Sequence, residues 1–472
     1  MQAGHLQQAL PFAECAVEKL RTCAPAHGML AAILFQLGRA ADAETIVDQA
    51  LQCEPGPADA YDALAHVSML LGQHERSNAL YRRVVELAPD DSRFWYNLAS
   101  SERSVGRLLE AEAACDRAIS LDSTQYQSYL LRSELRVQSP ESNHIAELQT
   151  VLARPGLEER ARVPVGYALA KELDDLKRFD EAFYWYHAAA SIRRRYLRYD
   201  IASDERKLER IQEVFTPKLI RQAAHGGDSS RYIFIVGLPR SGTTLLEHIL
   251  TGLDGVRSNG ETDNFSRALL AAAPQGSSDV FSRAAAADPV MVAANYARFA
   301  QRRSASTKII EKLPMNYLYL GAIRRALPQA KLILVRRSPL DSCFAMYRTL
   351  FAAAYPFSYD FNELARYYAA YDRLTGHWLE SFGDAFCEVE YESLVRSPQE
   401  TGARVAEHCD LHWDLHATEV ETRLSVSLTA SAAQIRRPIY GSSSGRWRLY
   451  RNYLGPLVSA LRTCGVPLPV DA

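Results

Sequence analysis

Residues 231–253 read RYIFIVGLPRSGTTLLEHILTGL, and this stretch decides the fold of the second half of the chain. YIFIV is a short apolar run of β-branched and aromatic residues, which is typical of a strand buried in a parallel sheet. GLPRSGTT is a glycine-rich turn, and LLEHILTGL has the apolar spacing of a helix. Strand, loop and helix in this order predict an α/β domain with a parallel sheet.

The loop has the G-x-x-x-x-G frame of a phosphate cradle, in which backbone N–H groups and a helix N-terminus face an anion. A nucleotide triphosphatase needs lysine after the second glycine, and Thr243 stands there instead. The cationic residue is Arg240, inside the loop. An arginine beside backbone donors suits a planar anion with several oxygens. We expect Arg240 and residues Ser241, Gly242, Thr243 and Thr244 to bind such an anion.

Four further segments follow in order along the chain. They are NGETD (259–263) with Glu261, STKIIEKLPMNY (306–317) with Lys312, KLILVRRSPLDSCFAMYRTLF (331–351) with Arg337, and TASAAQIRRPIYGSSSGRW (429–447) with Arg446. KII and KLILV predict strands, so Lys312 and Arg337 would lie at strand ends. Residue type alone favours a carboxylate at a helix N-terminus for Glu261, and composition alone favours a surface loop for the last segment.

Together these segments resemble the sulfotransferase family that uses 3′-phosphoadenosine-5′-phosphosulfate (PAPS), in particular its tyrosylprotein sulfotransferase branch. The resemblance covers roughly residues 232–450 and implies a P-loop-like parallel-sheet domain. It implies that PRSGTT binds the 5′-phosphosulfate of PAPS. It also implies that Glu261 is the catalytic base, and that Lys312, Arg240 and Ser431 stabilise charge on the transferring and leaving oxygens.

The same resemblance assigns the rest of the nucleotide. Arg337 and Arg446 would hold the 3′-phosphate, while Ser431 and Gln434 match the S-x-x-Q of the family. The family has a serine where this chain has Ala345, so Ser342 or Arg348 is a candidate replacement. Tyr391, in EVEYESLV (388–395), is a candidate nucleotide contact, with core packing as the alternative.

The first part of the chain repeats with a period of 34 residues. Gly38, Gly72 and Gly106 follow this spacing, and alanine stands seven positions before each of them, at Ala31, Ala65 and Ala99. The pattern resembles the tetratricopeptide repeat, which implies two antiparallel helices per period and a solenoid. The aromatic residues Tyr61, Trp95 and Tyr129 fall at core positions of that template.

A weaker period runs through Gly166, Ala182 and Ala189, so we expect helices to about Phe215. The predicted architecture is therefore multidomain. An all-α tetratricopeptide-repeat array covers residues 1–215, a linker covers 216–230, and an α/β sulfotransferase domain covers 231–472. The repeats imply a protein partner by analogy alone.

The composition limits the classes of function that are open to this chain. The net charge of −2 does not favour a dedicated nucleic-acid binder. No apolar run reaches about 18 residues, which predicts no membrane span, and the N-terminus lacks the pattern of a signal peptide. The eight cysteines form no C-x-x-C pair or zinc-like cluster. We therefore expect reduced thiols, a cytoplasmic location and no metal.

The predicted reaction is in-line transfer of a sulfuryl group from PAPS to an acceptor hydroxyl, with Glu261 as base. The acceptor stays open between a peptide tyrosine, a carbohydrate and a small molecule. The aromatic segment 351–371 could line its entry or belong to the core. Two alternatives remain: a P-loop kinase-like phosphotransferase, and a repeat scaffold with an inactive enzyme domain.

Overall fold

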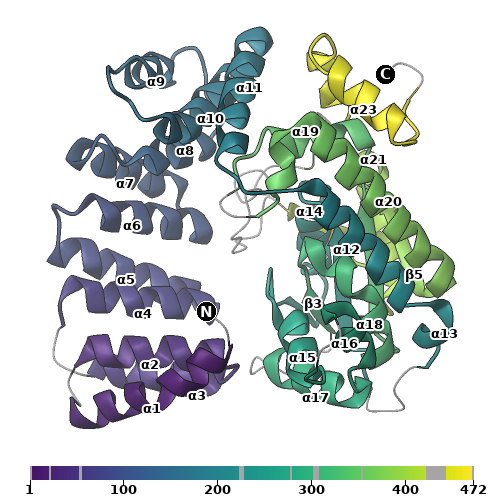
Figure 1. The fold of residues 1–472 in the computed structure, drawn as a ribbon. Coiled ribbons are helices and arrows are strands. Elements are labelled where there is room, and N and C mark those ends of the chain that lie inside the picture. Colours follow the sequence, from purple (N-terminus) through teal and green to yellow (C-terminus); the bar gives the residue numbers. More distant parts are fainter. Residues whose placement is uncertain are drawn as a thin grey trace. The chain divides into compact units, whose positions relative to one another are not determined.

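The computed structural model describes residues 3–20, 23–52, 56–222, 228–276, 279–300, 308–351, 354–420, 439 and 443–469. Backbone contacts divide the chain into two units. The first is Met1–Gln138, and the second contains Ser139–Arg423 and Leu428–Ala472. Each unit has its own core and is described by itself (Figure 1).

The first unit is a stack of antiparallel helices, drawn in purple and blue in Figure 1. Neighbouring helices pack as the pairs α2–α3, α4–α5 and α6–α7. The helices are α1 (Ala3–Lys19), α2 (Ala24–Gln36), α3 (Ala40–Gln52), α4 (Ala58–Leu70), α5 (His74–Leu87), α6 (Ser92–Val105), α7 (Leu108–Leu121) and α8 (Tyr126–Glu134).

The repeat template is confirmed at its glycines and alanines. Gly38, Gly72 and Gly106 have φ values of 80°, 71° and 91°, and each lies in the turn between the two helices of a pair. This left-handed conformation favours glycine because it lacks Cβ. The alanines seven positions earlier are completely buried, which lets the helices approach closely: Ala31, Ala65 and Ala99.

The repeat aromatics belong to the core, as the template predicts. Tyr129 is buried, while Tyr61 and Trp95 are partly buried and pack against the core of the first unit. The Trp95 indole N–H also donates to the Pro89 carbonyl at 2.8 Å. Ser77 occupies a position where the other repeats have alanine, and its hydroxyl donates to the Ala65 carbonyl at 2.8 Å. A polar side chain is thus tolerated at this buried position because its hydrogen bond is satisfied.

Five helices precede the sheet and belong to the second unit: α9 (Ile145–Leu152), α10 (Glu159–Asp175), α11 (Phe179–Arg195), α12 (Ile201–Val214) and α13 (Pro217–Ile220). The weak repeat is a real helix pair, since a Cβ at Gly166 would lie 3.1 Å from the Cβ of Ala189. Helix α12 packs on the long helix α20 (Phe361–Phe382). The spatial boundary therefore falls after Gln138, whereas the domain boundary at 215 stays a prediction from sequence.

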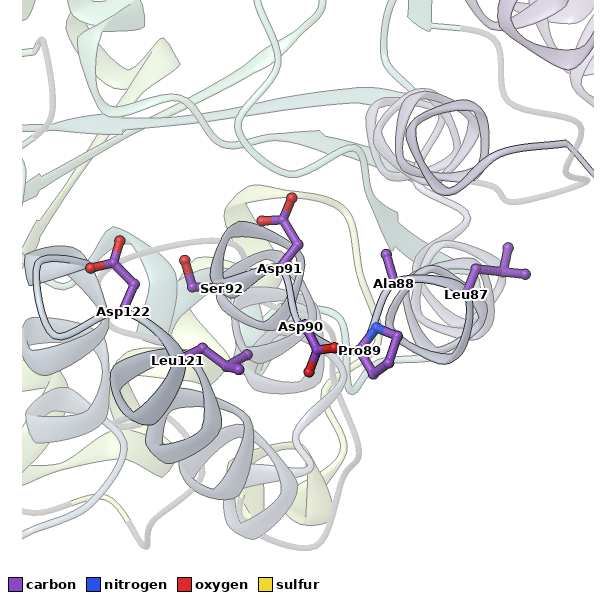
Figure 2. A pocket seen from close by; sticks show the side chains of 8 residues that line it. All are labelled: Leu87, Ala88, Pro89, Asp90, Asp91, Ser92, Leu121 and Asp122. Atoms are coloured by element: carbon purple, nitrogen blue, oxygen red, sulfur yellow. The ribbon is translucent and has the colours of Figure 1, made fainter.

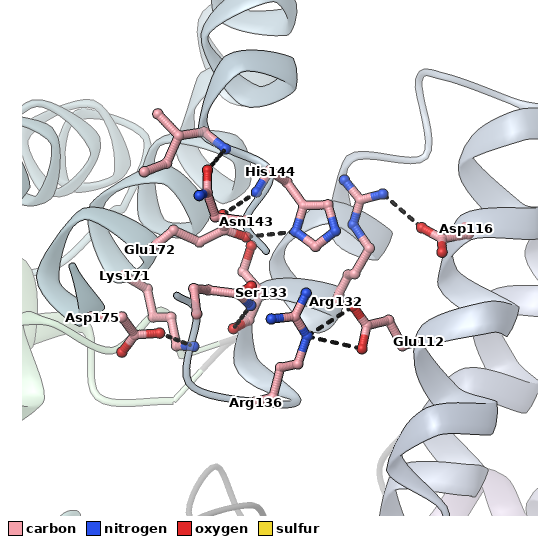
Figure 3. A network of polar contacts seen from close by, with 12 residues as sticks. Glu112, Asp116, Arg132, Ser133, Arg136, Asn143, His144, Lys171, Glu172 and Asp175 are labelled. Atoms are coloured by element: carbon pink, nitrogen blue, oxygen red, sulfur yellow. Dashed lines mark hydrogen bonds and ion pairs between the residues drawn. The ribbon is translucent and has the colours of Figure 1, made fainter. Parts of the chain in front are cut away.

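Buried polar contacts tie helices together within each unit (Figure 3). In the first unit, Arg132 of α8 pairs with Asp116 of α7 at 2.7 Å. In the second, the completely buried Glu172 of α10 accepts from the backbone N of His144 at 2.6 Å and lies 3.0 Å from its Nδ1. Glu172 thus fixes the start of α9 against α10.

The second unit contains a parallel sheet of five strands in the order β2-β3-β1-β4-β5. The strands are β1 (Tyr232–Gly237), β2 (Val256–Ser258), β3 (Lys308–Glu311), β4 (Lys331–Arg336) and β5 (Phe386–Glu390). The predicted strands at YIFIV, KII and KLILV are confirmed as β1, β3 and β4. Because the chain moves to opposite sides of β1 to form β3 and β4, the carboxyl end of β1 is a topological switch point, where open sheets bind ligands.

Helices cover both faces of this sheet, which explains its apolar strands. Ile233 and Ile235 share a core cluster with Leu246 of α14 and Val405 of α22, while the ring of Phe234 packs at 6.0 Å from that of Phe265 on α15. The remaining elements are α14 (Thr243–Leu250), α15 (Asn264–Ala272), α16 (Val280–Ala286), α17 (Pro289–Ala300), η1 (Pro314–Tyr319), α18 (Leu320–Ala326), α19 (Pro339–Tyr347), η2 (Pro356–Tyr359), η3 (Gly383–Ala385), α21 (Tyr391–Arg396), α22 (Pro398–His408), η4 (Leu415–Thr418), η7 (Arg446–Tyr450) and α23 (Gly455–Thr463).

Two glycine-to-alanine substitutions should change stability in opposite directions. Gly106→Ala places a Cβ in the left-handed region and should cost about 1–2 kcal/mol. Gly376→Ala, inside α20 with no atom within 4 Å of the added Cβ, should stabilise by roughly 0.5–1 kcal/mol. Calorimetric unfolding of the full chain measures both, and a stabilising Gly106→Ala would contradict the repeat turn.

Candidate active site

Residues 238–242 connect β1 to α14 in a strained conformation. This segment is named the anion loop after its predicted role. Arg240 has φ +67°, which is rare for a residue other than glycine, and Gly242 has φ +102°. Gly242 is the N-cap of α14 and offers no side chain to the helix amides. The first N–H groups of the helix therefore lack a side-chain cap, as an anion site requires. Strain of this kind commonly marks a binding loop.

Arg337 and Tyr391 both contact the backbone of this loop. Arg337 Nη1 donates to the Arg240 carbonyl at 2.9 Å, and its guanidinium lies 4.7 Å from the centre of the Tyr391 ring. A Cβ at Gly242 would lie 2.3 Å from Cδ2 of Tyr391, so glycine is required there by contact as well as by φ. The core-packing interpretation of Tyr391 is thus supported by geometry, and a nucleotide contact stays a prediction.

Among the residues that the structure describes, several buried donors near the loop have no hydrogen-bond partner. They are the hydroxyls of Ser241 and Ser338 and the Nε of Arg337. Ser338 precedes α19, directly after Arg337, at the carboxyl end of β4. Burial also lowers the pKa of Arg337, although Asp341 at 4.0 Å opposes this. Unused buried donors are costly, and an anionic ligand would satisfy them.

A buried ammonium group lies between two carboxylates at the end of β3. Lys312 is inaccessible to solvent, and its Nζ lies 2.6 Å from Glu261 Oε1 and 3.5 Å from Glu247 Oε2. Burial raises the pKa of Glu247, while Lys312 and a hydrogen bond from Ser258 oppose the rise. Glu247 lies one turn after Thr243 in α14, about 5 Å along the helix, which brings the Glu261–Lys312 pair next to the anion loop.

Glu261 lies on a short segment that continues from β2. The Asn259 N–H donates to the Ile310 carbonyl at 2.8 Å, and the Lys312 N–H donates to the Gly260 carbonyl at 3.2 Å. Gly260 has φ +72°, so glycine allows the turn that presents the next residue. The Glu261 side chain is 35% exposed, which leaves it accessible to an incoming hydroxyl group.

Glu311 precedes Lys312 and is completely buried. Its carboxyl group accepts hydrogen bonds from the Thr262 hydroxyl, from the amides of Asn259 (3.4 Å) and Asn264 (3.5 Å), and from the Tyr296 hydroxyl (3.3 Å). Burial raises the pKa of Glu311 to about 7, and the hydrogen bonds oppose the rise. A carboxyl group that titrates near neutral pH therefore lies behind the segment that carries Glu261.

Arg446, the second candidate for the 3′-phosphate, pairs with Asp174 of α10 at 2.6 Å. Arg348 pairs with the same carboxylate at 2.7 Å, and the Tyr450 hydroxyl donates to it. Although Asp174 is buried, the two guanidinium groups hold its pKa below the usual range. Asp341 accepts from the backbone N–H groups of Gly445 (2.6 Å) and Trp447 (3.1 Å), which fixes Arg446 near the start of α19.

The replacement candidates for the absent serine have other partners. Ala345 is buried in α19, the Ser342 hydroxyl donates to the Arg337 carbonyl at 3.2 Å, and Arg348 is held by Asp174. Ser431 and Gln434 lie outside the described residues. The structure thus brings Arg240–Thr244, Arg337 and Tyr391 together, joins Glu261 to Lys312, and places Arg446 on Asp174.

The aromatic segment 351–371 divides between the two predicted roles. Tyr367 and Tyr371 of α20 are buried in the core, and the Tyr367 and Tyr317 hydroxyls lie 2.6 Å apart. Tyr355 precedes η2 with φ +54°, and burial followed by the nearby Glu261 charge raises its pKa. The helical half is therefore core, while Tyr355 lies within electrostatic range of Glu261 and stays a candidate for the acceptor entry.

The first unit has a pocket of its own, lined by Leu87–Ser92, Leu121 and Asp122 (Figure 2). Its acidic groups already have local partners. Asp91 caps α6 and pairs with Arg93 at 2.6 Å, and Asp90 pairs with Arg117 at 3.4 Å. Asp122 accepts from the Thr124 N–H at 2.8 Å. These carboxylates stabilise the repeat turns, and the pocket gives no evidence for a ligand.

The parts of the chain that the structure describes hold neither a metal-type cluster nor a membrane-spanning helix. No three His, Cys, Asp or Glu side chains gather as they would around a metal ion. Among the same residues, no helix combines the length and the apolar character needed to cross a membrane.

Residues 232–415 match the family model described as "Sulfotransferase family". Residues 1–67, 58–91 and 92–125 match models of the tetratricopeptide repeat. This chain joins tetratricopeptide repeats to a sulfotransferase-family domain. The matched part of the sulfotransferase domain contains the anion loop, Glu261, Lys312, Arg337 and Tyr391.

Two curated proteins are similar to this chain over different shares of its length. An "Uncharacterized protein" of Aquifex aeolicus (strain VF5) is 29% identical over 374 residues, which cover 76% of this chain and 49% of that protein. This chain therefore spans about half the length of that relative. A Caenorhabditis briggsae protein named "Putative protein-tyrosine sulfotransferase" is 26% identical over 233 residues, covering 46% of this chain and 80% of that protein.

Among solved structures, the sulfotransferase domain of the Synechococcus PCC 7002 olefin synthase is similar to this chain. It is 20% identical, with a TM-score of 0.37, and the match covers 52% of this chain and 98% of that one.

Three residues that matter to the geometry were missed by the sequence analysis: Glu247, Glu311 and Asp174. Glu311 directly precedes Lys312 at a strand end, and a charged residue there was a usable signal. Glu247 is the one carboxylate in the apolar helix LLEHILTGL, which also indicated a buried partner. Asp174 gave no such signal, because its partners Arg348 and Arg446 lie far away in sequence.

The raised pKa of Glu311 predicts a pH-dependent stability. The unfolded chain loses this proton near its ordinary pKa of 4.5, whereas the folded chain keeps it to about pH 7. Stability relative to the Glu311→Gln variant should therefore fall as pH rises from about 4.5 to 7, in total on the order of 3 kcal/mol. Calorimetric unfolding of both proteins across this range measures it, and a constant difference would contradict the buried, titrating carboxyl group.

Proposed function

We propose that this chain transfers a sulfuryl group from PAPS to an acceptor hydroxyl by in-line displacement, with Glu261 as the base. The observation that carries the proposal is the 2.6 Å contact between Glu261 and the buried Lys312, whose Nζ also lies 3.5 Å from Glu247, one helical turn after the start of α14. A carboxylate for the acceptor proton and a cation for the leaving group thus lie beside an anion cradle.

The residues around the loop fit the anionic ends of PAPS. The uncapped amides of α14, Arg240 and the unpartnered Ser241 hydroxyl would hold the 5′-phosphosulfate. Arg337, whose Nε has no partner, and the Ser338 hydroxyl would hold the 3′-phosphate. Arg446 would contribute by leaving Asp174 in part, since Arg348 still neutralises that carboxylate. Ser431 and Gln434 keep their proposed nucleotide role from the sequence resemblance.

The step itself needs no other reactant. The acceptor oxygen attacks sulfur as its proton passes to Glu261, and the bond between sulfur and the phosphate oxygen breaks. The leaving group is adenosine 3′,5′-bisphosphate, whose developing charge faces Arg240, Lys312 and, from the resemblance, Ser431. Lys312 has three N–H donors, and its two carboxylate partners leave one for a substrate oxygen. Glu261 is exposed enough to return its proton to water.

The proposed acceptor is a tyrosine phenol in a peptide. The name of the Caenorhabditis briggsae relative supports this, and Tyr355, whose pKa burial and the charge of Glu261 raise, is a candidate to contact a phenol ring. The repeats would then bind a protein partner. We also propose a cytoplasmic location, because buried Cys343, Cys387 and Cys409 are free thiols.

Ligand binding and turnover test this function directly. The full chain should bind adenosine 3′,5′-bisphosphate in calorimetry more tightly than Mg-ATP, and should transfer labelled sulfate from PAPS to tyrosine peptides in preference to sugars and small phenols. Preference for Mg-ATP would instead support a phosphotransferase, and binding of neither nucleotide would support an inactive scaffold. Transfer to a sugar or small phenol alone would keep the reaction and replace the acceptor.

Glu261→Gln should lower kcat by roughly 100-fold or more, because the amide cannot accept the acceptor proton. Its affinity for adenosine 3′,5′-bisphosphate should change little, since Glu261 does not form the anion loop. Asp263→Asn is the matched control, because this exposed carboxylate lies on the same segment and pairs only loosely with Arg267, at 3.6 Å. Equal turnover of Glu261→Gln and wild type would remove Glu261 from the mechanism.

Arg337→Ala should reduce the discrimination between adenosine 3′,5′-bisphosphate and adenosine 5′-monophosphate. A lost charge-assisted hydrogen bond of about 1.5–3 kcal/mol corresponds to roughly 10- to 100-fold in affinity for the bisphosphate alone. Affinity for the monophosphate provides the internal control for loop damage, because Arg337 also holds the Arg240 carbonyl. Equal losses for both nucleotides would show that Arg337 supports the loop and does not read the 3′-phosphate.

A further inference from the structure

We propose that Glu311 is the positioning residue of the active site, and that its buried carboxylate holds residues 259–264 so that Glu261 reaches Lys312. The inference rests on the proposed function for its catalytic consequence. Its structural part concerns only how one segment is held, and can be tested without turnover.

The hydrogen bonds of Glu311 fall on both sides of Glu261. Asn259 lies two residues before the base, and Thr262 and Asn264 lie one and three residues after it. The Glu311 carboxyl group therefore binds residues at both ends of the short turn that carries Glu261. Backbone hydrogen bonds also hold this turn, at Asn259 and Gly260 near its start and at Asp263, whose carbonyl accepts from the Arg267 N–H at 3.0 Å.

Glu311 and Lys312 act on the segment from opposite sides. Successive side chains point to opposite faces at the end of a strand, so these neighbours diverge. Glu311 points toward Tyr296 of α17 and the side chains of Asn259, Thr262 and Asn264, whereas Lys312 points toward Glu261 and Glu247. Lys312 thus holds the Glu261 side chain on one side of the segment, and Glu311 holds the segment itself on the other side.

All four groups bonded to Glu311 are neutral donors. The other titratable groups that bear on this carboxyl are the phenols of Tyr296 on α17 and Tyr232 on β1, whose pKa values its charge helps to raise. Glu261 and Asp263 are on the segment itself, and Lys312 is the next residue of the chain. Two asparagine amides, a threonine hydroxyl and a tyrosine hydroxyl match a carboxylate that accepts. A protonated carboxyl gains a donor of its own and loses part of this match.

Hydrogen exchange of the full chain without nucleotide tests the positioning. At about pH 8, Glu311→Gln should raise exchange in peptides covering residues 256–266 by about tenfold, because the amide places a donor against donors. Glu172→Gln is the matched control, since Glu172 is an equally buried carboxyl of the same unit (Figure 3). Unchanged exchange in Glu311→Gln would overturn the proposal.

Turnover then separates positioning from general support. Glu311→Gln should lower kcat by about tenfold while the Kd for adenosine 3′,5′-bisphosphate stays within about twofold. Loss of bisphosphate affinity with kcat unchanged would refute a positioning role. If the variant does not fold, Thr262→Val, which removes one donor to the Glu311 carboxyl, should raise exchange in the same peptides, and unchanged exchange there would overturn the proposal. If Glu311→Gln changes hydrogen exchange as expected but the wild-type protein transfers no sulfate, the proposed function is refuted and the positioning role of Glu311 stands.

Discussion

The charge of Lys312 is the constraint on which the rest of the site depends. Its ammonium group is excluded from solvent, and a buried charge without partners is prohibitively costly. Glu261 and Glu247 supply the compensation, and they come from different elements. The need to neutralise one lysine therefore fixes the segment after β2 against the second turn of α14, where Glu247 lies. The same arrangement places a carboxylate and an ammonium group beside the helix terminus that closes the anion loop.

The parallel sheet provides the frame for this arrangement. Its order β2-β3-β1-β4-β5 places the ends of β2 and β3 on one side of the loop after β1 and the end of β4 on the other. Glu261 and Lys312 come from the first side, and Arg337 comes from the second. The strained backbone of Arg240 is held by the Arg337 guanidinium, so the loop conformation and the candidate 3′-phosphate ligand are coupled.

The helices between Ser139 and Val214 are part of the second unit, although one pair still follows the repeat pattern. Asp174 explains how they support the site, because it joins α10 to Arg348 at the end of α19 and to Arg446 and Tyr450 of η7. Breaking either ion pair of this buried carboxylate is costly, because a buried charge is then left without its partner. A helix pair of repeat origin thus stabilises the enzyme part of the chain.

The sequence by itself determined the local elements and the residue types that carry chemistry. The 34-residue period predicted the helix pairs, because positive-φ turns require glycine and close helix contacts require alanine. The apolar runs predicted β1, β3 and β4, the loop composition predicted an anion site with Arg240, and the resemblance to sulfotransferases pointed to Glu261, Lys312 and Arg337. Only the tertiary structure decided which charges meet. It paired Lys312 with Glu261 and Glu247, surrounded Glu311 with neutral donors, and placed Arg446 on Asp174, which is 272 residues away. Propensity and spacing act over a few residues, whereas the partner of a buried charge depends on how distant elements pack.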